Sequence, residues 1–216
     1  MCSSDLMAQK RILVVVDPTA SFHPAIERAA WIARALGAHV ELFICDYDSH
    51  LTNARGLTAT AVAEAKAALL DRHGARLRQL ADPLAAQGIE VAVDARWDYP
   101  LQDGIVRKAL DSNADLVVKD THFHPVLKRS IFSNTDWSLV RSCPTTLWLV
   151  KPRPQGHKPC FVAAVDPLHE RDKPADLDQR ILDTAAELAR ALDGELDRKS
   201  TRLNSSHTDI SRMPSS

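Results

Sequence analysis

The chain has 216 residues, of which 45% are hydrophobic and 25% charged, and its formal net charge is -1. This composition is typical of a globular protein and disfavours a disordered chain, a collagen-like fibre and a disulfide scaffold. The near-zero charge argues against a nucleic-acid binder, and the lack of an apolar run of about 18 residues argues against a membrane protein. Four widely spaced cysteines without a CxxC motif indicate free thiols in a reducing cytosol.

Both ends of the chain differ in character from the rest. Residues 197–216 are rich in serine and have no apolar periodicity, and back-translation of this segment and of residues 1–6 resembles sequencing adapters. We therefore expect residues 1–6 to be an artefactual leader and residues 197–216 an artefactual disordered tail. A polar natural tail is the alternative for the second segment.

The predicted elements alternate between strands and helices. The first strand, 12–16, is apolar on both faces and ends at Asp17-Pro18, as expected of a central parallel strand. A helix over 24–36 follows, with Gly37 at its C-cap, and Pro83 is expected to kink or divide a later helix. The further strands are expected at 40–45, 89–93, 116–118 and 145–150, and the further helices at 58–87, 100–110 and 134–142. This order predicts an α/β fold with a parallel sheet covered on both faces.

The pattern then begins again. The apolar run 161–165 ends in Asp166-Pro167, and residues 189–192 repeat the Ala-Arg-Ala-Leu sequence of residues 33–36. A repeat of this length indicates tandem domains rather than a solenoid. We expect a complete domain at 7–152, a linker at 153–158 and the truncated start of a second domain, one strand and one helix, at 159–196.

In this order of elements, the chain resembles the universal stress protein family, above all its tandem-domain E type. The resemblance implies an adenine nucleotide alpha hydrolase-like (Rossmann-like) fold: an open five-stranded parallel sheet of order 3-2-1-4-5 with helices on both faces. It also implies a cytoplasmic stress-response protein whose domains or copies pair through the fifth strand. The segments that carry the resemblance are 12–17, 115–119, 132–137 and 143–150.

The resemblance places strands one and four side by side, where open α/β sheets bind ligands beyond the carboxyl ends of the strands. Members of the family that bind ATP direct the equivalent of Asp17 towards the adenosine. Their phosphate loop follows strand four with the pattern Gly-x-x-Gly, about nine residues, then Gly-Ser/Thr. The crevice residues expected in this chain are Asp17, Lys119, Asp120, Thr121, Ser133 and Asn134.

The chain departs from that pattern at every glycine. Asp120 stands at the first glycine, Phe123 or His124 near the second, and Ser133-Asn134 at the final pair. Because a carboxylate at residue 120 repels phosphate, we expect no cofactor and no ATP binding of the family's usual kind. We expect Lys119 to form an ion pair with Asp17; a solvent-facing Lys119 is the alternative.

Other residues carry weaker signals. His122 and His124 could bind zinc, but no third ligand lies near them in sequence, so we expect no metal site. Trp137 is expected to pack in the core, and His73 is expected on a loop or polar helix face with no role in a site. Lys128 and Arg129 could receive an acidic protein partner, although a solvated face is the simpler interpretation.

These observations favour a non-enzymatic stress-response or binding module with a degenerate nucleotide site in the N-terminal domain. One alternative is an ATP-binding or ATP-hydrolysing stress protein, and another is a protein-binding scaffold. A related enzyme such as an ATP pyrophosphatase or adenylyl transferase would need a Ser-Gly-Gly-x-Asp-Ser loop after the first strand. The chain has Asp17-Pro18-Thr19-Ala20 there.

Overall fold

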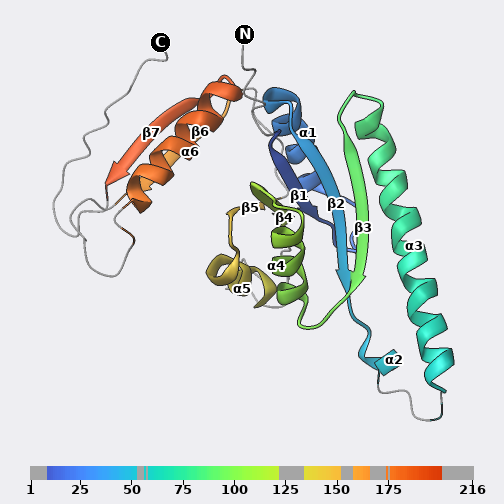
Figure 1. Cartoon of the computed structure of the whole chain (residues 1–216). Helices are drawn as coiled ribbons and strands as arrows, with labels where there is room; N and C mark the ends of the chain where they lie inside the picture. Colours follow the sequence, from blue (N-terminus) through green and yellow to red (C-terminus); the bar gives the residue numbers. More distant parts are fainter. Residues whose placement is uncertain are drawn as a thin grey trace, which may run out of the picture. The chain divides into compact units, whose positions relative to one another are not determined.

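The computed structural model describes residues 9–52, 56, 58–121, 134–151, 158–165, 174 and 176–200. The chain divides into two compact units, Met1–Arg153 and Pro154–Ser216, and each is described by itself (Figure 1). Among the described residues, the helices are too short or too polar to cross a membrane.

The first unit contains the predicted sheet. Five parallel strands lie in the order β3-β2-β1-β4-β5, which confirms the fold class and the strand order that the sequence predicts (Figure 1). β1 lies at the centre between β2 and β4, and four of its five residues are buried because it has helices on both faces. The strands are β1 (Arg11–Val15), β2 (His39–Asp46), β3 (Val91–Trp97), β4 (Leu116–Asp120) and β5 (Thr146–Val150).

Helices cover both faces of this sheet. α4 and α5 pack on the face that carries Leu13, Phe43 and Val117, while α1 and α3 lie on the opposite face (Figure 1). The helices are α1 (Pro24–Leu36), α2 (Ser49–Thr52), α3 (Ala59–Ala85), α4 (Leu101–Asp111) and α5 (Asn134–Ser142). The hydrophobic core therefore consists of two layers separated by the sheet.

Local sequence explains where the helices begin and end. Pro24 opens α1, and Gly37 ends it in the left-handed conformation with φ 62°. The Thr58 hydroxyl caps α3 by accepting a hydrogen bond from the Ala61 N–H at 3.2 Å. α3 is not divided at Pro83 but continues to Ala85, because a proline in the last turn displaces few backbone hydrogen bonds.

Trp137 is 47% exposed, so its predicted place in the core is wrong. α5 buries Asp136 and Leu139, three residues apart on one face, and Trp137 lies beside that face.

The second unit contains β6 (Cys160–Val165), α6 (Leu177–Ala191) and β7 (Glu195–Ser200), with the two strands parallel (Figure 1). α6 covers one face of β6, burying Ala163 and Val165, while Val162 on the other face is exposed. β7 continues past residue 196, so residues 197–200 form a strand rather than the disordered tail expected from the sequence. The foreign origin of the two termini and the domain limits stay predictions.

Candidate functional site

The candidate site lies where β1 and β4 end side by side. Val15 of β1 pairs with Lys119 of β4 in the parallel register, so the residues after both strands meet at the carboxyl edge of the sheet. The chain leaves β1 towards β2 and β3 on one side, and leaves β4 towards β5 on the other. This gap is the switch point at which open α/β sheets bind their ligands. It brings Asp17, Asp120 and Thr121 to the same edge.

Asp17 directs its carboxylate into its own loop. Its Oδ1 accepts hydrogen bonds from the Thr19 backbone N–H at 2.7 Å and from the Thr19 hydroxyl at 2.6 Å, which is an Asx turn. α3 holds the same loop, because Arg76 donates to the carbonyl oxygens of Pro18, at 2.7 Å, and Ala20. The loop after β1 is therefore held by side-chain hydrogen bonds from two parts of the chain.

Lys119 is buried and pairs with a carboxylate from α5. Its ammonium forms an ion pair with Asp136, 2.8 Å from Oδ1, and donates a hydrogen bond to the Asp120 carbonyl at 2.9 Å. The predicted ion pair between Lys119 and Asp17 is therefore wrong. Strand alternation gives the reason: Lys119 shares a face with Val117, which packs in the cluster that includes α5, so the ammonium reaches the first turn of that helix. Asp136 is fully buried there.

Asp120 reaches the start of α1. Its Oδ1 accepts a hydrogen bond from the Ala25 backbone N–H at 2.7 Å, and the residue is buried. Ala25 is the second residue of α1, so its N–H is one of those that the helix itself leaves without an acceptor. The N-terminus of a helix carries partial positive charge and favours an anion. Asp120 therefore supplies from β4 the negative charge that the start of α1 favours.

Thr121 and Asn134 stand at the two ends of the segment in which the resemblance places a phosphate loop. The backbone N–H and the hydroxyl of Thr121 both donate to the Val150 carbonyl, at 2.8 and 3.0 Å, so this residue ties β4 to β5. Asn134 is the exposed first residue of α5. The other residues singled out between them lie outside the described part of the chain: His122, Phe123, His124, Lys128, Arg129 and Ser133.

These contacts limit what the crevice can bind. A phosphate at the start of α1 would have to displace the Asp120 carboxylate, because both are anions that compete for the same backbone N–H. A phosphate bound to Lys119 would have to compete with Asp136, which lies in the protein interior. Two carboxylates of the chain, Asp120 and Asp136, therefore already contact the start of α1 and the Lys119 ammonium.

Sequence reasoning missed a buried pair beside the site. His73 of α3 lies with its Nε2 2.7 Å from Asp46 Oδ2 at the end of β2, and His73 is buried rather than placed on a polar face. The signal that could have revealed it is the spacing to Leu77, four residues on, which puts both on the apolar face of α3. In the described ranges, no cluster of three or more histidine, cysteine or acidic residues is arranged to hold a metal ion.

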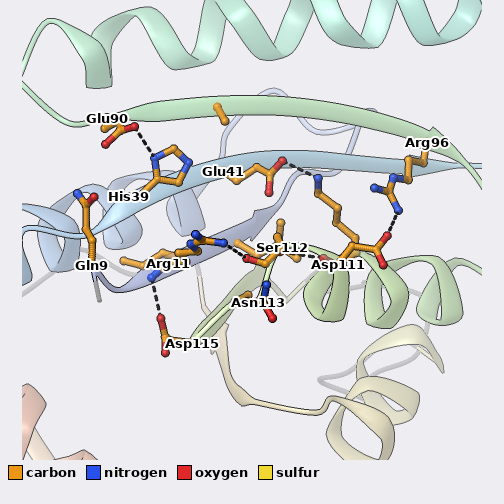
Figure 2. A pocket seen from close by; sticks show the side chains of 15 residues that line it. Gln9, Arg11, His39, Glu41, Glu90, Arg96, Asp111, Ser112, Asn113 and Asp115 are labelled. Atoms are coloured by element: carbon orange, nitrogen blue, oxygen red, sulfur yellow. Dashed lines mark hydrogen bonds and ion pairs between the residues drawn. The ribbon is translucent and has the colours of Figure 1, made fainter. Parts of the chain in front are cut away.

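The hollow in Figure 2 lies at the other end of the sheet, near the start of β1 and β2, and has a volume of about 790 Å³. The charges that line it pair with one another: Lys108 with Glu41 at 2.6 Å, and Arg96 with Asp111 at 2.6 Å. Figure 2 labels the pair of Arg96 and Asp111. Lys108 also donates to Asp94 at 2.8 Å. Burial alone would raise the Asp94 pKa, but Lys108 and then Arg96 hold it below its usual value. The charged side chains that line the hollow therefore form a network of ion pairs within the chain.

Comparisons with known proteins agree with this architecture. The model of the universal stress protein family matches residues 9–151. The chain is similar to universal stress protein E of Photorhabdus laumondii, at 28% identity over 180 residues, which cover 83% of this chain and 57% of that protein. It is 26% identical over 185 residues to universal stress protein E of Escherichia coli K12, with the same shares covered.

A crystal structure of a functionally unknown protein from Pseudomonas aeruginosa PAO1 shares the fold, with a TM-score of 0.68 and 23% identity. That likeness covers 88% of this chain and 60% of the other. The chain thus spans somewhat more than half the length of the curated relatives it matches. The family model accounts for most of the chain, including both strands that form the crevice, and the chain therefore belongs to the universal stress protein family.

Proposed function

We propose that the protein is a non-enzymatic stress-response module whose first unit contains a degenerate nucleotide site. The observation that carries this proposal is the hydrogen bond from the Ala25 N–H to the Asp120 carboxylate, at 2.7 Å. A glycine is expected at this position in members of the family that bind ATP, because the backbone must approach the phosphates closely. Here a buried carboxylate takes the place of a bound anion at the start of α1.

The pair between Lys119 and Asp136 supports the same conclusion. Breaking a buried ion pair is strongly destabilising when it leaves one charge without a partner. A phosphate that bound Lys119 would leave the fully buried carboxylate of Asp136 without this cation. Binding of a triphosphate in this crevice therefore carries two electrostatic costs that a glycine-lined crevice does not have.

Thermal unfolding followed by tryptophan fluorescence tests the proposal. All four tryptophans, residues 31, 97, 137 and 148, lie in the first unit, so the signal reports on that unit alone. We expect no change in the unfolding temperature with millimolar ATP and magnesium. A ligand at one hundred times its Kd stabilises a protein by about 2.7 kcal/mol, so a clear increase would contradict the degenerate site.

The same preparation separates the alternatives. Release of phosphate from ATP above a no-protein control would support an ATP-hydrolysing stress protein and contradict the non-enzymatic proposal. A protein-binding scaffold would instead retain partners in a pull-down and lose them when the charges of Lys128 and Arg129 are reversed. The matched control reverses Lys10 and Arg11, an adjacent basic pair in the first unit.

We further propose that copies or domains associate through β5, and that the protein acts in the cytoplasm. β5 is an edge strand of the sheet, so one side of its backbone can pair with another strand. The cytoplasmic assignment is supported by the family and by cysteines that form no disulfide among the described residues. Hydrogen exchange of residues 146–150 at increasing protein concentration tests the pairing. We expect protection to rise; protection independent of concentration would contradict association of copies through β5.

A further inference from the structure

The chain contains two tyrosines, Tyr47 and Tyr99, and their rings are in contact although the residues lie far apart in sequence. Tyr47 directly follows β2, and Tyr99 follows the end of β3. The two ring centroids are 4.6 Å apart, and the ring planes are inclined by 34°. This arrangement is close to offset stacking, in which aromatic rings touch through their faces. The fold therefore brings the two phenol groups of the chain together.

The ends of the two strands hold the tyrosines in this contact. Asp46 of β2 pairs with Trp97 of β3 in the parallel register, so the residues that follow both strands emerge side by side. The Tyr47 N–H donates to the Asp46 carboxylate at 2.8 Å. The Tyr99 N–H donates in the same way to the Asp98 carboxylate at 2.9 Å. Because both backbones are fixed, each ring meets the other at a high effective concentration.

The two rings differ in their access to solvent. Tyr99 is 66% exposed, whereas Tyr47 is half-buried and contacts the rings of both Tyr99 and Trp97. An oxidant in solution therefore reaches Tyr99 directly. Since the two tyrosine rings touch, an electron that Tyr99 loses is replaced from Tyr47, and the exposed ring is then oxidised a second time. One accessible phenol is thus enough to oxidise both.

Trp97 is the competing electron donor, because its ring centroid lies 5.5 Å from that of Tyr47. The Lys66 ammonium lies 4.8 Å from the centroid of the Trp97 ring. A cation at this distance disfavours the positive charge that an oxidised indole carries. An oxidised tyrosine releases its phenol proton to water and becomes a neutral radical, which the ammonium does not oppose. The charge beside Trp97 therefore directs oxidation to the two tyrosines.

We propose that Tyr47 and Tyr99 form an oxidative cross-linking site, which a one-electron oxidant of the peroxidase class converts into dityrosine. The oxidant takes one electron from each phenol, and each phenol releases its hydroxyl proton to water. A carbon–carbon bond then forms between the two ring carbons that neighbour the oxygen-bearing carbons. The hydrogen on each of these carbons moves to the oxygen as a proton and restores the aromatic ring. The product has lost two hydrogen atoms, and the oxidant has gained two electrons.

The cross-link would join the ends of two neighbouring strands, β2 and β3. Closing the long loop between Tyr47 and Tyr99 lowers the conformational entropy of the unfolded chain, so the cross-linked first unit is more stable than the reduced one. The site lies away from the crevice between β1 and β4, and it does not depend on the proposed loss of nucleotide binding. It gives the first unit a second, oxidised state.

The test is oxidation of the purified protein with a haem peroxidase and hydrogen peroxide. We expect the blue fluorescence of dityrosine and a monomer whose mass is lower by two hydrogen atoms. Peptide mapping should recover a cross-linked pair of peptides that contains Tyr47 and Tyr99. In urea unfolding followed by tryptophan fluorescence, the midpoint of the cross-linked monomer should be higher than that of the untreated protein.

Variants separate contact from exposure. Tyr47→Phe and Tyr99→Phe should each abolish the cross-linked monomer, because each leaves a single phenol. The matched control is the double variant Tyr99→Phe/Phe22→Tyr, which restores two tyrosines. Residue 22 is 59% exposed, and the described ring contacts of Tyr47 are with Trp97 and Tyr99. This control should form no cross-linked monomer, and the tryptophan fluorescence of each variant checks that the first unit is folded.

Several results would overturn the proposal. These are oxidation of Trp97 with both tyrosines left intact, a covalent dimer of two copies without the cross-linked monomer, and a cross-linked monomer in the Tyr99→Phe/Phe22→Tyr control at the yield of the unchanged protein. The first would show that the indole is the electron donor. The second would show that the two rings of one copy are not held for coupling. The third would show that exposure, rather than contact, decides the yield.

Discussion

β1 of the first unit and β6 of the second have similar sequences and different surroundings. Both are short apolar runs followed by Asp-Pro, at Asp17 and at Asp166. β1 has a strand on each side and helices on both faces, and Leu13 and Val15 are buried. Within the described part of the second unit, β6 has one neighbouring strand and one helix, so its residues alternate between covered and exposed. An apolar strand is therefore buried on both faces only where the rest of the sheet and its helices are present.

The ion pairs of the two units differ in the same way, and this difference gives the largest expected effect. Lys119→Met leaves the buried Asp136 without its cation, which should destabilise the first unit by about 3–5 kcal/mol in urea unfolding followed by tryptophan fluorescence. Lys158→Met is the matched variant in the second unit, where Lys158 lies 3.7 Å from Glu195 and both are about half exposed. This variant should lower the free energy of unfolding of the second unit by at most about 1 kcal/mol, as measured by hydrogen exchange of α6.

Equal losses of stability at the two lysines would contradict the difference between the two units. The double variant Lys119→Met/Asp136→Leu separates charge from packing. We expect it to recover part of the lost stability, because an apolar pair leaves no buried charge uncompensated. A double variant as unstable as Lys119→Met would show that packing, rather than charge, decides the effect.

The apolar faces of the two strands should show the next largest difference. Leu13→Ala removes a fully buried side chain in contact with the cluster beneath α4 and α5, and should cost about 3 kcal/mol in the fluorescence transition. Val162 is the equivalent position of β6 and is exposed. Val162→Ala should change the stability of the second unit by less than about 0.5 kcal/mol in hydrogen exchange. A large cost at Val162 would mean that this face is covered in solution.

Two equivalent helices, α1 and α6, are followed by different residues, a glycine and an aspartate. Gly37 ends α1 with φ 62°, and Asp193, at the equivalent place after α6, has φ 49°. Gly37→Ala should destabilise the first unit by about 1 kcal/mol, because a Cβ is strained in this conformation even where space is open. Asp193→Gly should stabilise the second unit by somewhat less, since aspartate tolerates this conformation better than most residues. Loss of stability in Asp193→Gly would contradict this account.

Thiol labelling compares the exposure of one cysteine in each unit. Burial, assisted by Asp98 and Asp46, raises the pKa of Cys45 in the first unit to about 12. Since the thiolate is the reactive form, native Cys45 should resist iodoacetamide at pH 8. Cys160 of β6 is exposed and should be alkylated before Cys45, as peptide mapping by mass spectrometry would show. Alkylation of Cys45 before Cys160 would contradict the burial described for β2.

Most of the fold could be predicted from the sequence, but less of the candidate site. Apolar runs and helix caps located the strands, and the family resemblance supplied their order, because both depend on local pattern. The partner of Lys119 was missed because it depends on which sheet face residue 119 shares and on where α5 begins. His73 was missed for a related reason: its partner Asp46 comes from another element, 27 residues away in sequence.

α3 contacts the ends of two neighbouring strands through side chains only three residues apart. His73 contacts Asp46 at the end of β2, and Arg76 donates to carbonyls of the loop after β1. Both loops are thereby attached to the same helix. The loop beside Asp17 and the loop beside Tyr47 therefore share one support, although they come from different strands.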